Sequence, residues 1–343
     1  MGSRRHAPRA LVVGAGLTGA ALAWVASRSG YAVDVVSAER PASQATALAP
    51  GIVHGLGPPG GVPYWAGLSD EQLAAEADRA QRGYEILREV LLAARAPCGY
   101  RRVAHRMLLP PGFGERAREV AERLCRAGFA VEIELRAPVA ALRGRREALV
   151  SPRRLVYELL AQARARGARV RCGVVARGEP SSDGAPVEVR IDEQRESYDM
   201  VFWATGGPPP GASARPGAGW QMVLRQTFAA GSKTLDRVMV AEDGDLLLVP
   251  DAGERERVIL LRRGSESRDA GLCWPQPPEE WGVWLGPVIH QRLAEAWAVP
   301  SEPSVPAAGP EVALTGLDGW PICAVLGAAG RLVESVLHVS LII

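Results

Sequence analysis

The chain has 343 residues, of which 47% are hydrophobic and 23% are charged, as in a globular protein with a sizeable core and room for two domains. A formal net charge of +2 excludes a strong overall field for DNA, and the apolar runs are shorter than the roughly 20 residues that span a membrane. The five cysteines occur singly, without a C-x-x-C pair, so we expect a cytoplasmic protein with no disulfide framework and no metal site.

The first elements are predicted to be a strand, a glycine turn, a helix and a second strand. Residues 10–13 form an apolar run that ends in glycine, which is typical of a buried strand. Residues 17–29 are rich in alanine and predict a helix that packs closely on a sheet and ends at Gly30. The apolar segment 31–37 then returns as a parallel strand through a right-handed crossover.

The next part of the chain predicts three helices separated by strands. Residues 69–96 form a long helix, with Ser69 and Gln72 as a capping box and Pro97 as its end. A second helix covers 114–128, and Ser151 and Pro152 suit the start of a third. Strands are expected over 129–135, 168–175, 187–191, 199–207, 244–250 and 257–263, and a further helix over about 278–298.

Two segments rich in proline and glycine, residues 206–219 and 300–310, indicate crossovers between domains. We therefore predict an α/β fold: a Rossmann-like nucleotide-binding domain with a parallel sheet, and an interleaved, mainly antiparallel α+β substrate domain. The nucleotide-binding domain, assigned below to FAD binding from its motif, is expected to be discontinuous, with residues 9–80, 145–215 and 310–343. The substrate domain takes residues 81–144 and 216–309.

The turn after the first strand has the spacing of a dinucleotide-binding loop. Glycines at 14, 16 and 19 let the backbone approach a pyrophosphate, whose charge the helix N-terminus favours. The residues assigned to this contact are Gly14, Ala15, Gly16, Leu17, Thr18 and Gly19. Because the chain carries a single motif of this kind, FAD is favoured over NAD.

The ribose of the nucleotide is expected at the end of the second strand. An acidic residue usually occupies this position, but counting from Gly14 places Ser37 there. Glu39 lies two residues later and reaches the ribose if the strand end is shifted. The turn Ser37–Arg40, with Ala38 between them, is therefore assigned to the cofactor, with Ser37 and Glu39 both open as the ribose ligand.

Five blocks of sequence resemble, in their order, the D-amino-acid oxidase (glycine oxidase-like) family of FAD-dependent oxidoreductases. They are VVGAGLTGAALAWVASRSGYAVDVV, ERPASQATALAPGIVHG, SPRRLVYELLAQARARGARV, DMVFWATGG and LDGWPI. The resemblance implies FAD as cofactor and a second set of contacts to it. These are Ala45, Thr46, Ala47, Pro50, Gly51, Ile52, Val174, Val175, Ala204, Thr205, Gly206, Asp318 and Gly319.

The reaction implied by the resemblance is oxidation of the C–N bond of an amine or amino acid, with hydride transfer to flavin N5 and oxygen as acceptor. No side-chain base is required if the neutral amine reacts. The position at which many members carry a carboxylate-binding arginine is Ala313 here, so Arg225 is the best alternative. His54 is a candidate active-site contact, a flavin attachment point or an ordinary loop histidine.

Two alternatives to this function follow from the sequence. One is an oxidase acting on the carboxymethylaminomethyl group of a tRNA wobble uridine, whose RNA the arginine-rich segment 153–171 would help to hold. The other is an FAD-binding protein impaired in turnover. Family members continue past the strand matching VESVLHVS into a helix that faces the flavin, whereas this chain stops at Ile343. We accordingly expect a missing segment or a partner chain to complete the flavin site.

Overall fold

The structure of the chain is a computed structural model, and it describes the following residues. These are residues 7–43, 46, 51–53, 66–109, 114–136, 139–145, 148–178, 187–205, 220–230, 237–240, 246–250, 257–264, 288–300, 312–315 and 322–325. From residue 220 onward the description concerns the backbone alone. Within this part of the chain, no helix combines the length and the apolar character needed to cross a bilayer.

The first sheet has six strands in the order β19-β20-β13-β1-β2-β9. Its strands are β1 (Arg9–Val13), β2 (Ala32–Ser37), β9 (Arg169–Cys172), β13 (Met200–Trp203), β19 (Val312–Thr315) and β20 (Ile322–Val325). All neighbours pair in parallel except β19, which is an antiparallel edge strand. This sheet and its helices confirm the predicted Rossmann-like α/β fold.

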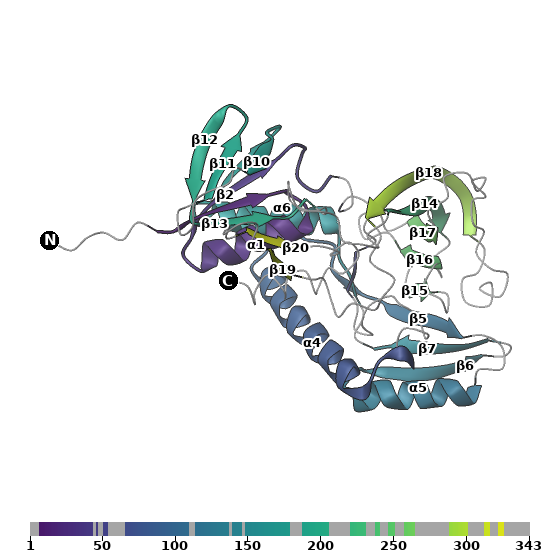
Figure 1. The fold of residues 1–343 in the computed structure, drawn as a ribbon. Helices are drawn as coiled ribbons and strands as arrows, with labels where there is room; N and C mark the ends of the chain where they lie inside the picture. The colour runs from purple at the N-terminus through teal and green to yellow at the C-terminus, as the bar shows by residue number, and fades with distance from the viewer. Residues whose placement is uncertain are drawn as a thin grey trace.

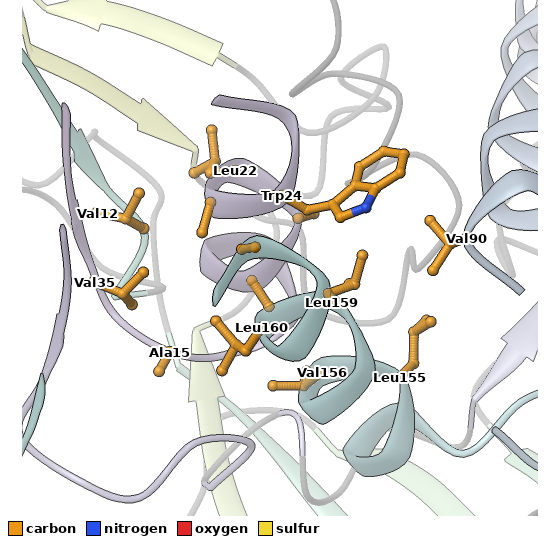
Figure 2. Packing of buried hydrophobic residues seen from close by; sticks show 14 of the residues in the cluster. Val12, Ala15, Leu22, Trp24, Val35, Val90, Leu155, Val156, Leu159 and Leu160 are labelled. Atoms are coloured by element: carbon orange, nitrogen blue, oxygen red, sulfur yellow. The ribbon is translucent and has the colours of Figure 1, made fainter. Parts of the chain in front are cut away.

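Helices α1 (Leu17–Arg28) and α6 (Pro152–Arg164) cover one face of this sheet (Figure 1). The alternation of a strand decides which residues meet them, because successive side chains point to opposite faces. Val12 and Val35 join the cluster formed by the two helices, and Figure 2 shows Leu22 of α1 and Leu160 of α6 in the same core. The small residues Ala20, Ala21 and Ala23 of α1 are fully buried in this core.

The opposite face of the sheet is covered by a three-stranded antiparallel meander. Its strands are β10 (Ala176–Gly178), β11 (Val187–Ile191) and β12 (Gln194–Tyr198). Leu11 and Val36 of the parallel sheet pack here against the inward-facing residues of β11. The parallel sheet is therefore buried on both faces, as the near-continuous apolar sequences of its strands require.

The second large sheet has eight strands in the order β18-β14-β17-β16-β15-β5-β7-β6 and is antiparallel except for the pair β15–β5. Its strands are β5 (Ala104–Leu109), β6 (Val131–Arg136), β7 (Val139–Gly144), β14 (Trp220–Ala230), β15 (Arg237–Val240), β16 (Leu246–Pro250), β17 (Arg257–Gly264) and β18 (Val288–Pro300). Helix α5 (Gly114–Arg126) packs beside β6, and the long α4 (Asp70–Leu92) runs from α5 towards α1 (Figure 1).

A third, small sheet joins β3 (Ile52–Val53), β8 (Ala148–Leu149) and β4 (Arg101–Arg102). The two segments rich in proline and glycine connect strands of different sheets: 206–219 links β13 to β14, and 300–310 lies between β18 and β19. The domain boundaries proposed from the sequence stay a prediction.

The helix predicted over about 278–298 is wrong where the structure describes it. Residues 288–300 form strand β18, which pairs with β14 from Trp220↔Pro300 to Ala230↔Val288. The long β14 offers hydrogen-bond partners along its whole length, and this pairing overrides the helical preference of the alanine-rich sequence.

The ends of two other helices differ from the prediction in detail. The capping box at Ser69 is present, but α4 ends at Leu92 and not at Ala96, because the Arg95 amide donates to the Glu158 carboxylate (3.2 Å) and leaves the helical pattern. Ser151 occupies the N-cap of α6 but its side chain makes no capping hydrogen bond.

Candidate functional site

The candidate residues converge on the carboxyl edge of the parallel sheet. The glycine loop follows β1, the Ser37–Arg40 turn follows β2, Val174 and Val175 follow β9, and Ala204 and Thr205 follow β13. These four strands are neighbours in the order β13-β1-β2-β9. Because parallel strands all end at the same edge, segments far apart in the sequence form one surface there, which is where α/β proteins bind ligands.

The first glycine of the loop is required by the close approach of β13. Gly14 has φ +110°, and a Cβ there would lie 2.4 Å from the carbonyl oxygen of Ala204. The Gly14 N–H donates to the Val36 carbonyl (2.8 Å) and the Ala204 N–H donates to the Val13 carbonyl (2.8 Å). The loop is thus held between β2 and the end of β13, and any larger residue would push these strands apart.

The third glycine allows helix α1 to start directly above the loop. A Cβ on Gly19 would lie 1.8 Å from the carbonyl oxygen of Gly14, so the helix can approach the strand this closely only with glycine there. The approach fixes the amino-terminal end of α1 at the carboxyl end of β1.

The amino-terminal end of α1 has an unbalanced positive dipole. Gly16 is the N-cap and contributes no side-chain hydrogen bond, and the first turn contains no acidic residue. The Leu17 N–H donates to the hydroxyl oxygen of Thr46 (3.0 Å), which comes from the second predicted contact segment. A helix end without a carboxylate attracts an anion, because its N–H groups and its dipole both favour negative charge.

The turn after β2 forms hydrogen bonds with the segment after β9 and with the glycine loop. The Ser37 carbonyl accepts from the Val174 N–H (3.2 Å), and the Ala42 N–H donates to the Ala15 carbonyl (3.0 Å). Ser37 is half-buried, whereas Ala38, Glu39 and Arg40 are exposed. Both candidate ribose ligands therefore lie beside the glycine loop, and the choice between Ser37 and Glu39 stays a prediction.

The remaining described candidates follow β9 or belong to the small sheet. Val174 packs partly into the core under the meander, and the Val175 N–H donates to the side chain of Asp192 (3.1 Å). The Gly51 carbonyl accepts from the Val150 N–H (2.8 Å), and Ile52 pairs with Leu149 in the small sheet.

Several predicted site residues lie outside the described residues. They are Ala45, Ala47, Pro50, His54, Gly206, Asp318 and Gly319. Arg225 belongs to β14, where its register partners are Leu261 on β17 and Glu295 on β18. Ala313 is part of edge strand β19, opposite Ala324. The roles proposed for Arg225 and His54 stay predictions.

An ion network inside the parallel sheet escaped the sequence analysis. The Asp34 carboxylate, 2% exposed, accepts from Arg169 (2.7 and 2.8 Å), from the Tyr198 hydroxyl (3.0 Å) and from Arg9 (3.2 Å). Burial opposes ionisation of Asp34, but these donors outweigh it and lower its pKa. The signal was an aspartate inside the apolar strand AVDVVS, which requires buried partners.

The phenol of Tyr198 closes this network from the meander. Its pKa is raised, because burial and the nearby Asp34 carboxylate both disfavour the phenolate. The hydroxyl therefore stays protonated, and its hydrogen bonds link β12 to β2 and to Glu196 (2.9 Å). This cluster is a structural support that fixes β2, whose end carries the candidate ribose turn.

The geometry fits a dinucleotide better than a metal. Among the described residues, no group of three histidine, cysteine, aspartate or glutamate side chains is placed to hold a metal ion. The glycine loop, in contrast, lies at a helix end whose N–H groups and dipole favour an anion. The glycine loop and the end of α1 therefore fit the pyrophosphate of a dinucleotide, with its nucleoside towards the ends of β2 and β9.

Comparison with known proteins gives a family match over most of the chain. The family model described as FAD dependent oxidoreductase matches residues 9–323. A search of curated proteins found no significant match to the sequence.

Solved structures share the fold at low sequence identity. Glycine oxidase from Geobacillus kaustophilus superposes with a TM-score of 0.72 at 14% identity, covering 98% of this chain and 94% of that one. Iminodiacetate oxidase from Chelativorans sp. BNC1 gives 0.68 at 17%, covering 97% and 94%. L-amino acid deaminase from Proteus vulgaris gives 0.71 at 13%, covering 99% and 94%.

Proposed function

The chain belongs to the family of FAD-dependent oxidoreductases, and on this premise we propose that it oxidises the C–N bond of an amine or an amino acid. The observation that carries the proposal is the glycine loop at the uncompensated end of α1, within a chain that the family model matches almost throughout. The names of three similar structures point to the substrate class, since they are a glycine oxidase, an iminodiacetate oxidase and an L-amino acid deaminase.

The described residues divide the work of holding FAD. The loop from Gly14 to Gly19 would hold the pyrophosphate at the helix end, with Thr46 beside it, and Ser37 or Glu39 would bind the ribose. When bound, FAD supplies an acceptor for the hydride that leaves a substrate carbon beside nitrogen, and the resulting imine is hydrolysed by water. The chain contributes binding and orientation, and a neutral amine needs no side-chain base.

The substrate end of the proposal rests on the eight-stranded sheet. Arg225 is the candidate for binding a substrate carboxylate, because guanidinium pairs with carboxylate in a planar, bidentate fashion. Replacing Arg225 by methionine should raise KM for an amino acid and leave KM for the matching amine without a carboxylate unchanged. Arg263, on neighbouring β17, provides the matched control variant. Equal effects on both substrates would remove Arg225 from the proposal.

The proposal is tested with the purified holoprotein under anaerobic conditions. Glycine, sarcosine, iminodiacetate and the D- and L-amino acids are added in turn, and the loss of flavin absorbance is followed. Bleaching by at least one compound, and hydrogen peroxide on admission of air, are the expected results. Dithionite serves as the positive control for a reducible flavin.

Other outcomes of this experiment overturn the proposal. Flavin that dithionite reduces but that only tRNA bearing a carboxymethylaminomethyl uridine bleaches would replace the substrate class by the RNA alternative. Flavin that no amine, amino acid or tRNA bleaches would favour the binding-only alternative. A cytoplasmic location and oxygen as electron acceptor stay predictions.

A further inference from the structure

The second glycine of the loop, Gly16, differs from Gly14 and Gly19 in the atoms that a side chain at its position would contact. Gly16 has φ −76° and ψ −170°, an extended conformation that any residue adopts. Among the described residues, a Cβ at Gly16 would meet one neighbour within 4 Å, the side-chain oxygen of Thr46 at 3.1 Å. At Gly14 and Gly19, in contrast, the added Cβ would collide with backbone carbonyls. The protein backbone therefore does not crowd position 16. The tight contact there is with the Thr46 side chain, in addition to the room that the pyrophosphate needs.

Thr46 performs the task that the N-cap residue leaves undone. In most helices, the side chain of the N-cap residue accepts a hydrogen bond from an amide of the first turn. Gly16 has no side chain, and the Leu17 N–H donates instead to Thr46 Oγ1 (3.0 Å), 29 residues further along the chain. Thr46 is 9% exposed, so water competes little for this bond.

We propose that Thr46 is a positioning residue of the FAD site, whose hydroxyl caps α1 from another segment and leaves little room for a side chain at position 16. The cap fixes the first turn of α1, the part that meets the pyrophosphate, to the segment of Thr46. The hydroxyl accepts from Leu17 and keeps its own hydrogen for a further acceptor, which an aliphatic side chain cannot do. The inference rests on FAD binding by the family and does not depend on the substrate class.

The first test compares the FAD affinity of two variants of Thr46, one without the hydroxyl and one that keeps it. Thr46→Val keeps the shape of threonine but removes the oxygen, whereas Thr46→Ser keeps the oxygen and removes the methyl group. We expect T46V to raise the Kd for FAD about fivefold, the equivalent of one helix cap, and T46S to stay within about twofold of the wild type. Ser27→Ala is the control, because Ser27 donates to Trp24 at the opposite end of α1.

The valine variant also shows whether the Thr46 oxygen supports FAD binding by capping α1 or competes with the pyrophosphate for the Leu17 N–H. If the Thr46 oxygen merely occupied an amide that the pyrophosphate needs, its removal would leave FAD bound equally tightly or more tightly. Wild-type or improved affinity in T46V, measured by titration of the FAD-free protein, would therefore overturn the proposal. Loss of affinity in both T46V and T46S would overturn it as well, since the hydroxyl would not be the determinant.

The second test is a double-mutant cycle on the FAD-free protein, read as the midpoint of thermal unfolding. Gly16→Ala is expected to lower the midpoint in the wild type and to have little further effect in a Thr46→Ala background, because the oxygen that crowds position 16 is gone. Gly19→Ala is the matched control, since its collision is with the Gly14 carbonyl and persists in both backgrounds. Equal costs of G16A with and without Thr46 would refute the coupling.

Discussion

Replacing Asp34 by asparagine tests how strongly the buried network holds the parallel sheet. The carboxylate receives Arg169 at 2.7 and 2.8 Å and the Tyr198 hydroxyl at 3.0 Å, and an amide cannot accept all of these donors. Hydrogen bonds to a charged group contribute about 1.5–3 kcal/mol each. Arg169 is 67% exposed and regains water, so its share is small, whereas the Tyr198 hydroxyl, in a side chain that is 1% exposed, keeps only the Glu196 carboxylate (2.9 Å) among its described acceptors.

We therefore expect Asp34→Asn to destabilise the protein by about 3 kcal/mol, which corresponds to a fall of roughly 5 °C in the midpoint of thermal unfolding. The measurement is differential scanning calorimetry with saturating FAD. Glu193→Gln is the control, because Glu193 pairs with Arg190 on the surface, where an ion pair contributes less than about 1 kcal/mol. If the two variants unfold within about 1 °C of each other, the reasoning about burial is refuted.

Three further predictions concern the acid titration of the Asp34 network, the hydrogen bond between Gln162 and Trp24, and the reactivity of Cys98. The lowered pKa values of Asp34 and Glu196 mean that their stabilisation is complete above about pH 5 and is lost progressively as the pH falls, so acid titration should unfold D34N with a shallower pH dependence than the wild type. Gln162→Leu should cost about 1–3 kcal/mol, seen in thermal unfolding, because it leaves the Trp24 indole N–H (2.8 Å from Gln162) without a partner. Burial raises the pKa of Cys98 to about 11, so its peptide should stay unalkylated by iodoacetamide at pH 7 while the exposed cysteines react, as mass spectrometry will show.

The elements next to the candidate site are those that local sequence predicts best. The structure places β1 and α1 within one residue of their expected ends, and the Ser69 capping box forms as its spacing indicates. Each of these features depends on residues a few positions apart: a β-branched run, a small-residue helix face, a serine three residues before a glutamine. The position of the glycine loop follows from them directly.

Features that depend on distant partners could not be predicted in this way. Strand β18 forms because β14, some seventy residues earlier in the sequence, offers a matching edge. Nothing local to 288–300 identifies that partner. The end of α4 is set by Glu158 on α6. The contact between Thr46 and Leu17 likewise joins segments whose proximity only the fold establishes. For the site, the sequence therefore predicted the residue types but not which of these residues form hydrogen bonds or ion pairs with each other.

The two supports of the site act on different properties, because they lie in different places. The Asp34 network lies inside the sheet under the meander, three residues before the end of β2, and all its partners are side chains of neighbouring strands. The Thr46 cap lies on the helix end to which we assign the pyrophosphate. Loss of the network should therefore lower the unfolding temperature while folded molecules keep their FAD affinity. Loss of the cap should weaken FAD binding at temperatures where the protein is still folded. A network variant that loses FAD affinity as much as T46V does would show that β2 transmits strain to its turn.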